Sequence, residues 1–197
     1  IDDESARIIR SHCRAEKLDA AALAQSAGLA GNLAIPLVKQ LTALVAQRSP
    51  DAARFVHWGA TSQDAIDSGL VLQLRSALNQ TDTLLNQLIA ALTAQCRRHS
   101  ATLMVGRTWL QHALPTTLGL KLAGTLDALL RFRVRLAEIR PRVLALQFGG
   151  AAGTLASFGE QGERVEQALA EALALPRSST PWHTQRDRLL ELAGWYA

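Results

Sequence analysis

A helical pattern without proline runs from Asp64 to about His99, and it is the feature that most constrains how this chain can fold. On one side of this expected helix an apolar residue recurs every seven positions, at Val71, Leu78, Leu85 and Leu92. Two more apolar residues, Leu74 and Leu88, lie on the neighbouring line along the helix. A helix of this length would span roughly 50 Å, more than a compact single-domain core needs. The pattern predicts one long helix in a bundle extended by partner subunits. The alternative is a long helix bent over its own domain.

The fold class predicted for the rest of the chain is also all-α, because alanine and leucine predominate and β-branched runs are too short to support strands. A second long helix is expected over 116–140, with Pro115 in its first turn and Pro141 interrupting or kinking it. Shorter helices are expected over 2–14, 19–27, 36–47, 160–175 and 187–196. We divide the chain into an N-terminal helical segment, 1–60, and a central long-helix bundle domain, 61–197, and expect both to be parts of a longer polypeptide.

Composition argues against several classes of function. The formal charge is +4, but the basic residues are scattered among acidic ones, and aromatic residues make up only 5% of the chain, so nucleic-acid binding is not expected. The longest uncharged stretch, 20–38, is broken by glycine, proline and amide residues, so no membrane span is expected. Cys13 and Cys96 match no disulfide framework, which indicates a reducing, cytoplasmic location.

Polar stretches between the helices hold the candidate functional residues. The first, 55–64, ends where the long helix starts, and Thr61 or Ser62 could cap that helix. The free backbone amides at a helix start suit an anionic ligand. The alternative is that this stretch is a plain helix cap with Asp64 in the first turn. The second, 106–119, offers Arg107 for bidentate carboxylate binding and His112 for proton transfer, unless that histidine is only a structural hydrogen-bonding residue.

A Gly-rich turn ending in Thr154 and a loop over 181–187 complete the polar stretches. Neither has the glycine spacing of a nucleotide-binding loop, and the five histidines are isolated from one another, so no cofactor and no metal ion are expected.

Taken together, these stretches resemble the fumarase/aspartase superfamily. Thr61-Ser62-Gln63-Asp64 followed by Asp67-Ser68-Gly69-Leu70 is similar to the first superfamily region. Gly106-Arg107-Thr108 and Gln111, continuing through Pro115-Thr116-Thr117 and Gly119, are similar to the second. The combination, in this order and separated by a long helix, is more specific than either motif alone.

The position after Arg107-Thr108 distinguishes branches of this superfamily. Lyases that release fumarate usually have a histidine there, whereas this chain has Trp109, whose indole can only donate a hydrogen bond. The resemblance therefore favours the cycloisomerase branch, which belongs to aromatic degradation and uses no cofactor. Two alternatives stay open: a fumarate-releasing lyase like adenylosuccinate lyase, and a non-catalytic helical assembly module.

The resemblance implies roles for particular residues. Carboxylates of a small tricarboxylate substrate would bind to five side chains: Thr61, Ser62, Arg107, Thr108 and Gln111. Trp109 would shape the pocket, Thr154 would line it, and Gln185 matches a substrate-binding glutamine. His57 and His112 are the candidates for proton transfer or polar contact, which makes them the candidate catalytic residues.

The resemblance also implies an assembly. Superfamily sites are shared between subunits of a homotetramer, so these residues would not all meet within one chain. The superfamily's Gly-Ser-Ser-x-Met-Pro loop, which supplies the expected serine base, is not found here, since the single methionine, Met104, lies outside any such motif. We therefore expect this chain alone to be inactive.

Overall fold

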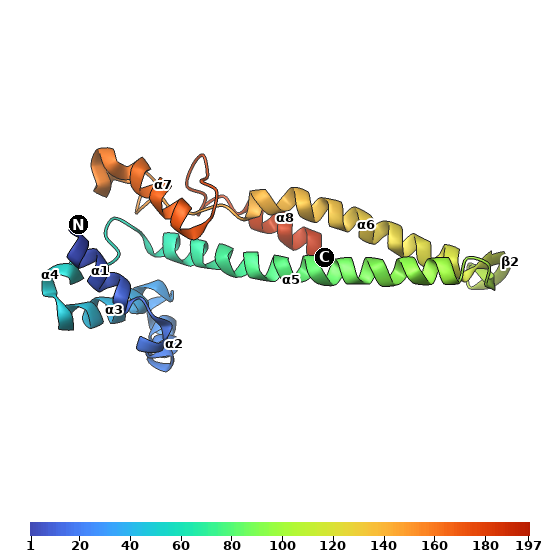
Figure 1. The fold of residues 1–197 in the computed structure, drawn as a ribbon, viewed down its shortest axis with the longest axis horizontal. Coiled ribbons are helices and arrows are strands. Elements are labelled where there is room, and N and C mark those ends of the chain that lie inside the picture. The colour runs from blue at the N-terminus through green and yellow to red at the C-terminus, as the bar shows by residue number, and fades with distance from the viewer. The chain divides into compact units, whose positions relative to one another are not determined.

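A computed structural model describes residues 1–197 and divides them into two compact units. Unit 1 comprises Ile1–Val71 and Ala145–Gln185, and unit 2 comprises Leu72–Leu144 and Arg186–Ala197. Eight α-helices and two short 3-10 helices account for the regular structure apart from one two-stranded sheet (Figure 1). The all-α prediction is confirmed, with that sheet as its exception.

The first part of unit 1 consists of four helices, namely α1 (Asp3–His12), α2 (Ala20–Ala30), α3 (Ala34–Arg48) and α4 (Pro50–Ala53), with the 3-10 helix η1 (Ala15–Lys17) after α1. The carboxylates of Asp2 and Asp19 cap α1 and α2 by accepting backbone N–H bonds. Pro36 lies in the first turn of α3, where a missing N–H costs no helical hydrogen bond. Apolar side chains of α1, α3 and α4 meet in a small core centred on three buried residues: Val45, Ala52 and Ala53.

The remainder of unit 1 combines the start of α5 (Ser62–Arg98) with segments from much later in the chain. Residues 145–150 have no regular secondary structure, yet every one of them is buried. They lead through a turn to the 3-10 helix η2 (Ala156–Gln161) and to α7 (Gly162–Leu173), which confirms the helix expected over 160–175 with shorter bounds. A buried loop must satisfy its backbone polar groups internally. Here the N–H of Leu146 donates to the Pro176 carbonyl at 2.9 Å, and the N–H groups of Gly149 and Gly150 donate to the Asp64 carboxylate.

Helix α5 has 37 residues, as the uninterrupted helical pattern predicted. Its seven-residue line is the buried one: Val71 and Leu78 are 0% exposed, Leu85 is 8% exposed, and Leu92 is half-buried. On the neighbouring line Leu74 is half-buried, but Leu88 is 48% exposed. The apolar stripe that is buried within this chain is therefore narrower than the stripe of apolar residues in the sequence, because part of the neighbouring line stays exposed.

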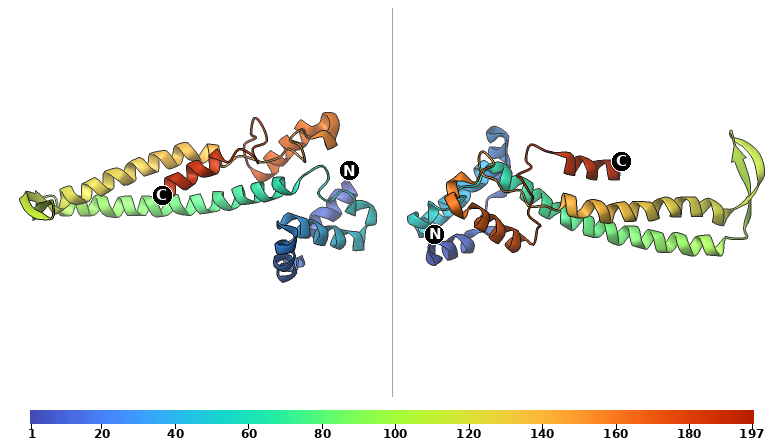
Figure 2. Two further views of the ribbon diagram at one scale, coloured as in Figure 1. Left: turned by 180° about the vertical axis from the view of Figure 1, so that it is seen from behind. Right: turned by 90° about the horizontal axis from the view of Figure 1, so that it is seen from above.

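In unit 2, helix α6 (Leu118–Val143) runs antiparallel to the part of α5 that begins at Leu72 (Figures 1 and 2). Hydrogen bonds mark the register: Arg140 donates to Asn79, Arg133 to Asn86, and the N–H of Gly119 to the carbonyl of His99. A Cβ at Gly119 would lie 2.8 Å from the His99 carbonyl oxygen, so only glycine allows this close approach.

A β-hairpin joins α5 to α6, where the sequence predicted a helix start and no strands. Strand β1 (Leu103–Thr108) pairs antiparallel with β2 (Gln111–Thr117), and Pro115 lies within β2 opposite Val105. Proline is tolerated because both strands of a two-stranded sheet are edges. The first-turn role predicted for Pro115 was therefore wrong. Helix α6 starts at Leu118, capped by the Thr117 hydroxyl, which accepts the N–H of Leu120 at 3.1 Å.

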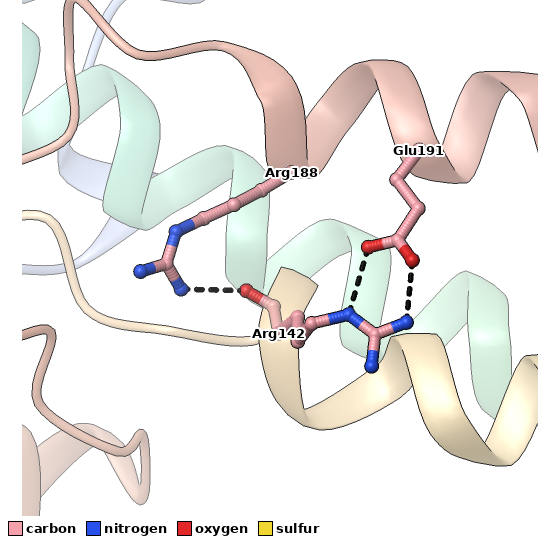
Figure 3. A network of polar contacts seen from close by, with 3 residues as sticks. All are labelled: Arg142, Arg188 and Glu191. Atoms are coloured by element: carbon pink, nitrogen blue, oxygen red, sulfur yellow. Dashed lines mark hydrogen bonds and ion pairs between the residues drawn. The ribbon is translucent and has the colours of Figure 1, made fainter.

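Helix α6 continues through Pro141 but ends two residues later, at Val143, so this proline lies in the last turn. Helix α8 (Asp187–Tyr196) packs against α6, with the indole of Trp195 edge-on to Phe132 and donating to its carbonyl at 3.0 Å. Figure 3 shows the polar link: Arg142 binds the Glu191 carboxylate through two nitrogens, and Arg188 donates to the Arg142 carbonyl. None of the helices is both long and apolar enough to cross a membrane.

Candidate functional site

The carboxylate of Asp64 is the centre of the polar structure in unit 1. This side chain is 3% exposed and accepts four hydrogen bonds. Oδ1 accepts from the side-chain amide of Gln147 and from the N–H of Gly149, both at 3.0 Å. Oδ2 accepts from the N–H groups of Gly150 at 2.9 Å and Thr61 at 3.0 Å. The start of α5 is thereby fixed to the buried 145–150 segment.

The bond from Asp64 to Thr61 is one half of a capping box, in which the third helical residue accepts the N–H of the residue before the helix. This supports the plain-cap interpretation for Asp64 itself. It also means that the Thr61 amide, one of those considered for an anionic ligand, is already bonded within the chain.

Gly150 can make its bond to Asp64 only as glycine. Its φ is +70°, and an added Cβ would lie 2.8 Å from the carbonyl oxygen of Gly59. The Gly-rich turn is therefore required by close backbone packing around a carboxylate, rather than by the phosphate binding for which such turns are best known.

Gln147 connects this arrangement to the 181–185 loop. Its side-chain oxygen accepts the N–H of Trp182 at 2.6 Å, and its side-chain nitrogen lies 3.3 Å from Nδ1 of His183. The indole of Trp182 donates to the Leu146 carbonyl at 3.0 Å, and Ser68 donates its hydroxyl to the Gln147 carbonyl at 2.7 Å. Trp182 is 2% exposed, so it anchors the loop in the core of the unit.

Of the candidate residues of unit 1, Thr61, Ser62 and Gln185 lie on segments that this network joins. His57, Thr61 and Ser62 are half-buried, and His57 lies in the turn before α5 with a φ of +60°, which is rare outside glycine. Thr154 and Gln185 are exposed; the N–H of Gln185 donates to the carbonyl of Trp182 at 3.0 Å. Unit 1 therefore carries a buried polar support with predicted substrate-binding residues on the segments that it joins.

The candidate residues of the second polar stretch lie on the hairpin of unit 2. Arg107 is paired with His112, and Thr108 with Gln111. Directly opposite residues of an antiparallel pair lie on the same face, so the guanidinium and the imidazole share one face, and the hydroxyl and the amide share the other. All four residues are exposed. One face of the hairpin therefore presents two nitrogen-rich groups suited to carboxylates.

Trp109 and Leu110 form the two-residue turn of this hairpin. Both have positive φ, of 49° and 63°, as a type I′ turn requires, although Asn and Gly usually fill these positions. The left-handed conformation costs about 1–2 kcal/mol for each residue with a Cβ. Each of the two side chains is 96% exposed. Trp109 therefore lies at the tip of a strained apolar turn within this chain, whereas the resemblance implied that it shapes a pocket.

Sequence analysis missed two of the residues that organise unit 1. Gln147 was not considered, and Asp64 was considered as a first-turn acid and as part of the first superfamily motif, but not as the centre of a buried network. The available signal was a single amide within the apolar run 143–148, since a buried amide requires partners. No group of three His, Cys, Asp or Glu side chains is placed to hold a metal ion.

Comparison with known proteins gives the family. The family model described as Lyase matches residues 13–197. A relative from Pseudomonas aeruginosa named 3-carboxy-cis,cis-muconate cycloisomerase is 59% identical over 185 residues, which cover 94% of this chain and 40% of that protein. The chain thus spans about 40% of the length of this curated relative.

Two solved structures are similar throughout the chain. The crystal structure of 3-carboxy-cis,cis-muconate lactonizing enzyme from Pseudomonas putida matches with a TM-score of 0.96 at 53% sequence identity. The matched region covers 99% of this chain and 44% of the Pseudomonas putida chain. The crystal structure of fumarate lyase from Mesorhizobium sp. BNC1 matches with a TM-score of 0.92 at 40% sequence identity. The matched region covers 99% of this chain and 45% of the Mesorhizobium chain. The family match and these two structures agree with the motifs, and this chain belongs to the lyase family, of the fumarase/aspartase type.

Proposed function

We propose that this chain is part of an enzyme that interconverts 3-carboxy-cis,cis-muconate and 4-carboxymuconolactone. The observation that carries the proposal is the similarity to relatives that share one name, 3-carboxy-cis,cis-muconate cycloisomerase, at 59%, 54% and 53% identity over 185 residues each. The motif residues 61–64 and 107–112 lie within the matched region.

The reaction is an internal addition that needs no second substrate. One carboxylate oxygen of the substrate forms a bond to a carbon of the conjugated double bond. The π electrons move to the neighbouring carbon, where a carboxylate stabilises them as an enolate-like species, and a proton is delivered to that carbon. The proton comes from an acid group of the site, for which His112 and His57 are the candidates, so the trianionic substrate gains one proton and the lactone is a dianion. Stabilising the developing negative charge is expected to be the largest catalytic contribution.

The hairpin offers the groups that this chemistry needs. Arg107 and His112 share one face, so a carboxylate of the substrate can accept bonds from the guanidinium while the imidazole contacts it or transfers the proton. Thr108 and Gln111, on the other face, would bind a different part of the substrate or a different substrate molecule. In unit 1, Thr61, Ser62, Thr154 and Gln185 would bind or line the site, with His57 the second candidate for proton transfer.

We further propose that the sites form between subunits of a homotetramer. Apolar side chains remain exposed on the helices of unit 2, including Leu84 at 64%, Leu88 at 48% and Val134 at 55%. Leu84 and Leu88 are four positions apart and so lie on the same face of α5, and grouped exposed apolar side chains mark surfaces that associate. Replacing Leu84 by Glu should reduce the assembly to smaller species in sedimentation experiments, whereas Thr83→Glu one position away should not; equal behaviour of the two variants would contradict this interface.

The thiols of Cys13 and Cys96 are unpaired, which supports placing this enzyme in the reducing cytoplasm.

The decisive experiment follows the ultraviolet absorbance of the conjugated diene when the full-length protein is mixed with 3-carboxy-cis,cis-muconate. Loss of the absorbance and formation of the lactone are expected. Arg107→Lys keeps the charge but removes the planar fork, so KM should rise about tenfold, corresponding to roughly 1.4 kcal/mol. Arg97→Lys, at the exposed end of α5, is the matched control. No turnover of the muconate together with release of fumarate from adenylosuccinate would overturn the proposal in favour of a fumarate-releasing lyase.

A further inference from the structure

Gln147 is 0% exposed, lies outside the motifs that carry the superfamily resemblance, and makes side-chain contacts to two separate segments of unit 1. It reaches the start of α5 through Asp64 and the 181–185 loop through Trp182 and His183. A buried amide with partners on both sides fixes the orientation of those partners as well as its own.

The hydrogen-bonding partners determine the positions of the oxygen and the nitrogen in the side-chain amide of Gln147. The backbone N–H of Trp182, 2.6 Å away, can only donate, so the amide oxygen faces it. The Asp64 carboxylate, 3.0 Å away and already accepting three backbone N–H bonds, faces the amide nitrogen. This nitrogen carries two hydrogens; one is directed to Asp64, and the second is available to Nδ1 of His183 at 3.3 Å.

This orientation determines the tautomer of His183. A ring nitrogen that faces an N–H donor must accept, so Nδ1 carries the lone pair and the ring proton is on Nε2. We propose that Gln147 is a positioning residue, which holds His183 as the Nε2–H tautomer and fixes the 181–185 loop to the start of α5. Neither effect requires Gln147 to contact the substrate.

The functional consequence rests on the proposed function, because it concerns the loop that carries Gln185. The side chain of Gln147 holds the N–H of Trp182, and the carbonyl of Trp182 accepts the N–H of Gln185. Only these two contacts separate the buried amide from the residue expected to bind substrate. Loss of the amide should therefore weaken substrate binding through the loop, while the chemistry carried out by the hairpin residues proceeds.

The first test is independent of activity. Long-range ¹H–¹⁵N NMR spectra of the full-length protein with ¹⁵N-labelled histidine report the tautomer of each ring, and His183→Gln identifies the signals that belong to His183. The expected result is the Nε2–H tautomer in the wild type and a mixture of tautomers in Gln147→Met, which has a similar volume and no donor. An Nδ1–H tautomer in the wild type, or an unchanged tautomer in Gln147→Met, would overturn the proposal.

The second test separates positioning from a general loss of structure. Ser68→Ala is the matched control, because it removes the two buried hydrogen bonds between the Ser68 hydroxyl and the backbone of the same glutamine and leaves the Gln147 side chain unchanged. We expect Gln147→Met to raise KM about tenfold, and Ser68→Ala to leave KM unchanged even where it lowers thermal stability. A fall in kcat with unchanged KM in both variants would show a merely structural role and would overturn the positioning claim.

The two readouts also separate this proposal from the proposed function. If the wild-type protein does not convert the carboxymuconate, the proposed function fails, and the His183 tautomer still decides whether Gln147 orients that ring.

Discussion

The side-chain nitrogen of Gln147 donates to Oδ1 of Asp64 over 3.0 Å, although the two residues are 83 positions apart in the chain. This bond joins the residue that caps the longest helix to a buried segment without regular secondary structure. Gln147 is 0% exposed and Asp64 is 3% exposed, so the bond forms where water cannot compete for either partner.

Replacing Asp64 by Asn should destabilise the protein strongly. The carboxylate accepts four N–H bonds, and an amide would direct its own N–H groups at two of those donors. We expect the free energy of unfolding to fall by at least about 2 kcal/mol. Urea unfolding measures this, with Asp82→Asn on the exposed face of α5 as the control. Similar urea midpoints for the two variants would show that the buried carboxylate is not required.

Leu78 tests the packing seam of α5. It is 0% exposed, so Leu78→Ala should lower the free energy of unfolding by about 2–4 kcal/mol through lost burial and a residual cavity. Thr83→Ala, at an exposed position of the same helix, should change it by less than about 0.5 kcal/mol. Calorimetry of both variants checks the difference, and an equal effect would mean that the seven-residue line is not the structural seam.

The hairpin turn offers a test of stored strain. Asn at position 109 and Gly at position 110 fit a type I′ turn, so the double change Trp109→Asn, Leu110→Gly should raise the free energy of unfolding by about 1–2 kcal/mol. If the exposed tip is needed for substrate binding or subunit contact, the same variant should lose turnover. Thermal unfolding and the diene assay are measured together. A gain in stability without loss of turnover would remove Trp109 from the proposed site.

The stability that the Arg142–Glu191 ion pair between α6 and α8 contributes should depend on pH. The Arg142 guanidinium donates to Glu191 and holds the pKa of that carboxyl below its ordinary value of 4.5. A lowered pKa in the folded state means that the ion pair adds stability above the unfolded-state pKa, and that this stability is lost as pH falls through the folded-state pKa.

Glu191→Gln should therefore unfold at a slightly lower temperature than the wild type at pH 7, and the difference should disappear once the pH has fallen below the lowered pKa of Glu191. The effect should be small, because both side chains are exposed to solvent. Melting curves of both proteins at a series of pH values check it. A difference that persists in acid would assign the loss to packing instead of charge.

The helices were predictable because their residues are periodic. The last one was expected over 187–196 and forms over those residues. The long helix was expected over 64–99 and forms from Ser62 to Arg98. The hairpin was not predicted, because Gly106 and Pro115 interrupt both strands and the turn at Trp109 and Leu110 lacks the usual Asn-Gly pair.

The polar support of unit 1 could not be predicted for a different reason. Gln147 contacts Trp182 and Asp64, which are 35 and 83 positions away, and no local pattern encodes contacts over such separations. Family resemblance supplied the candidate substrate-binding residues. It gave no indication of the buried amide that we propose as a positioning residue.

The seven-residue repeat of α5 limits how this chain can change length. Seven residues make nearly two full helical turns, so a gain or loss of seven keeps the line of Val71, Leu78 and Leu85 on one side. A single inserted residue rotates everything after it by about 100° around the helix axis and would turn Leu85 towards solvent. Relatives of this chain are therefore expected to differ in length mainly within its loops, and within the helix by a number of residues close to whole turns, such as seven.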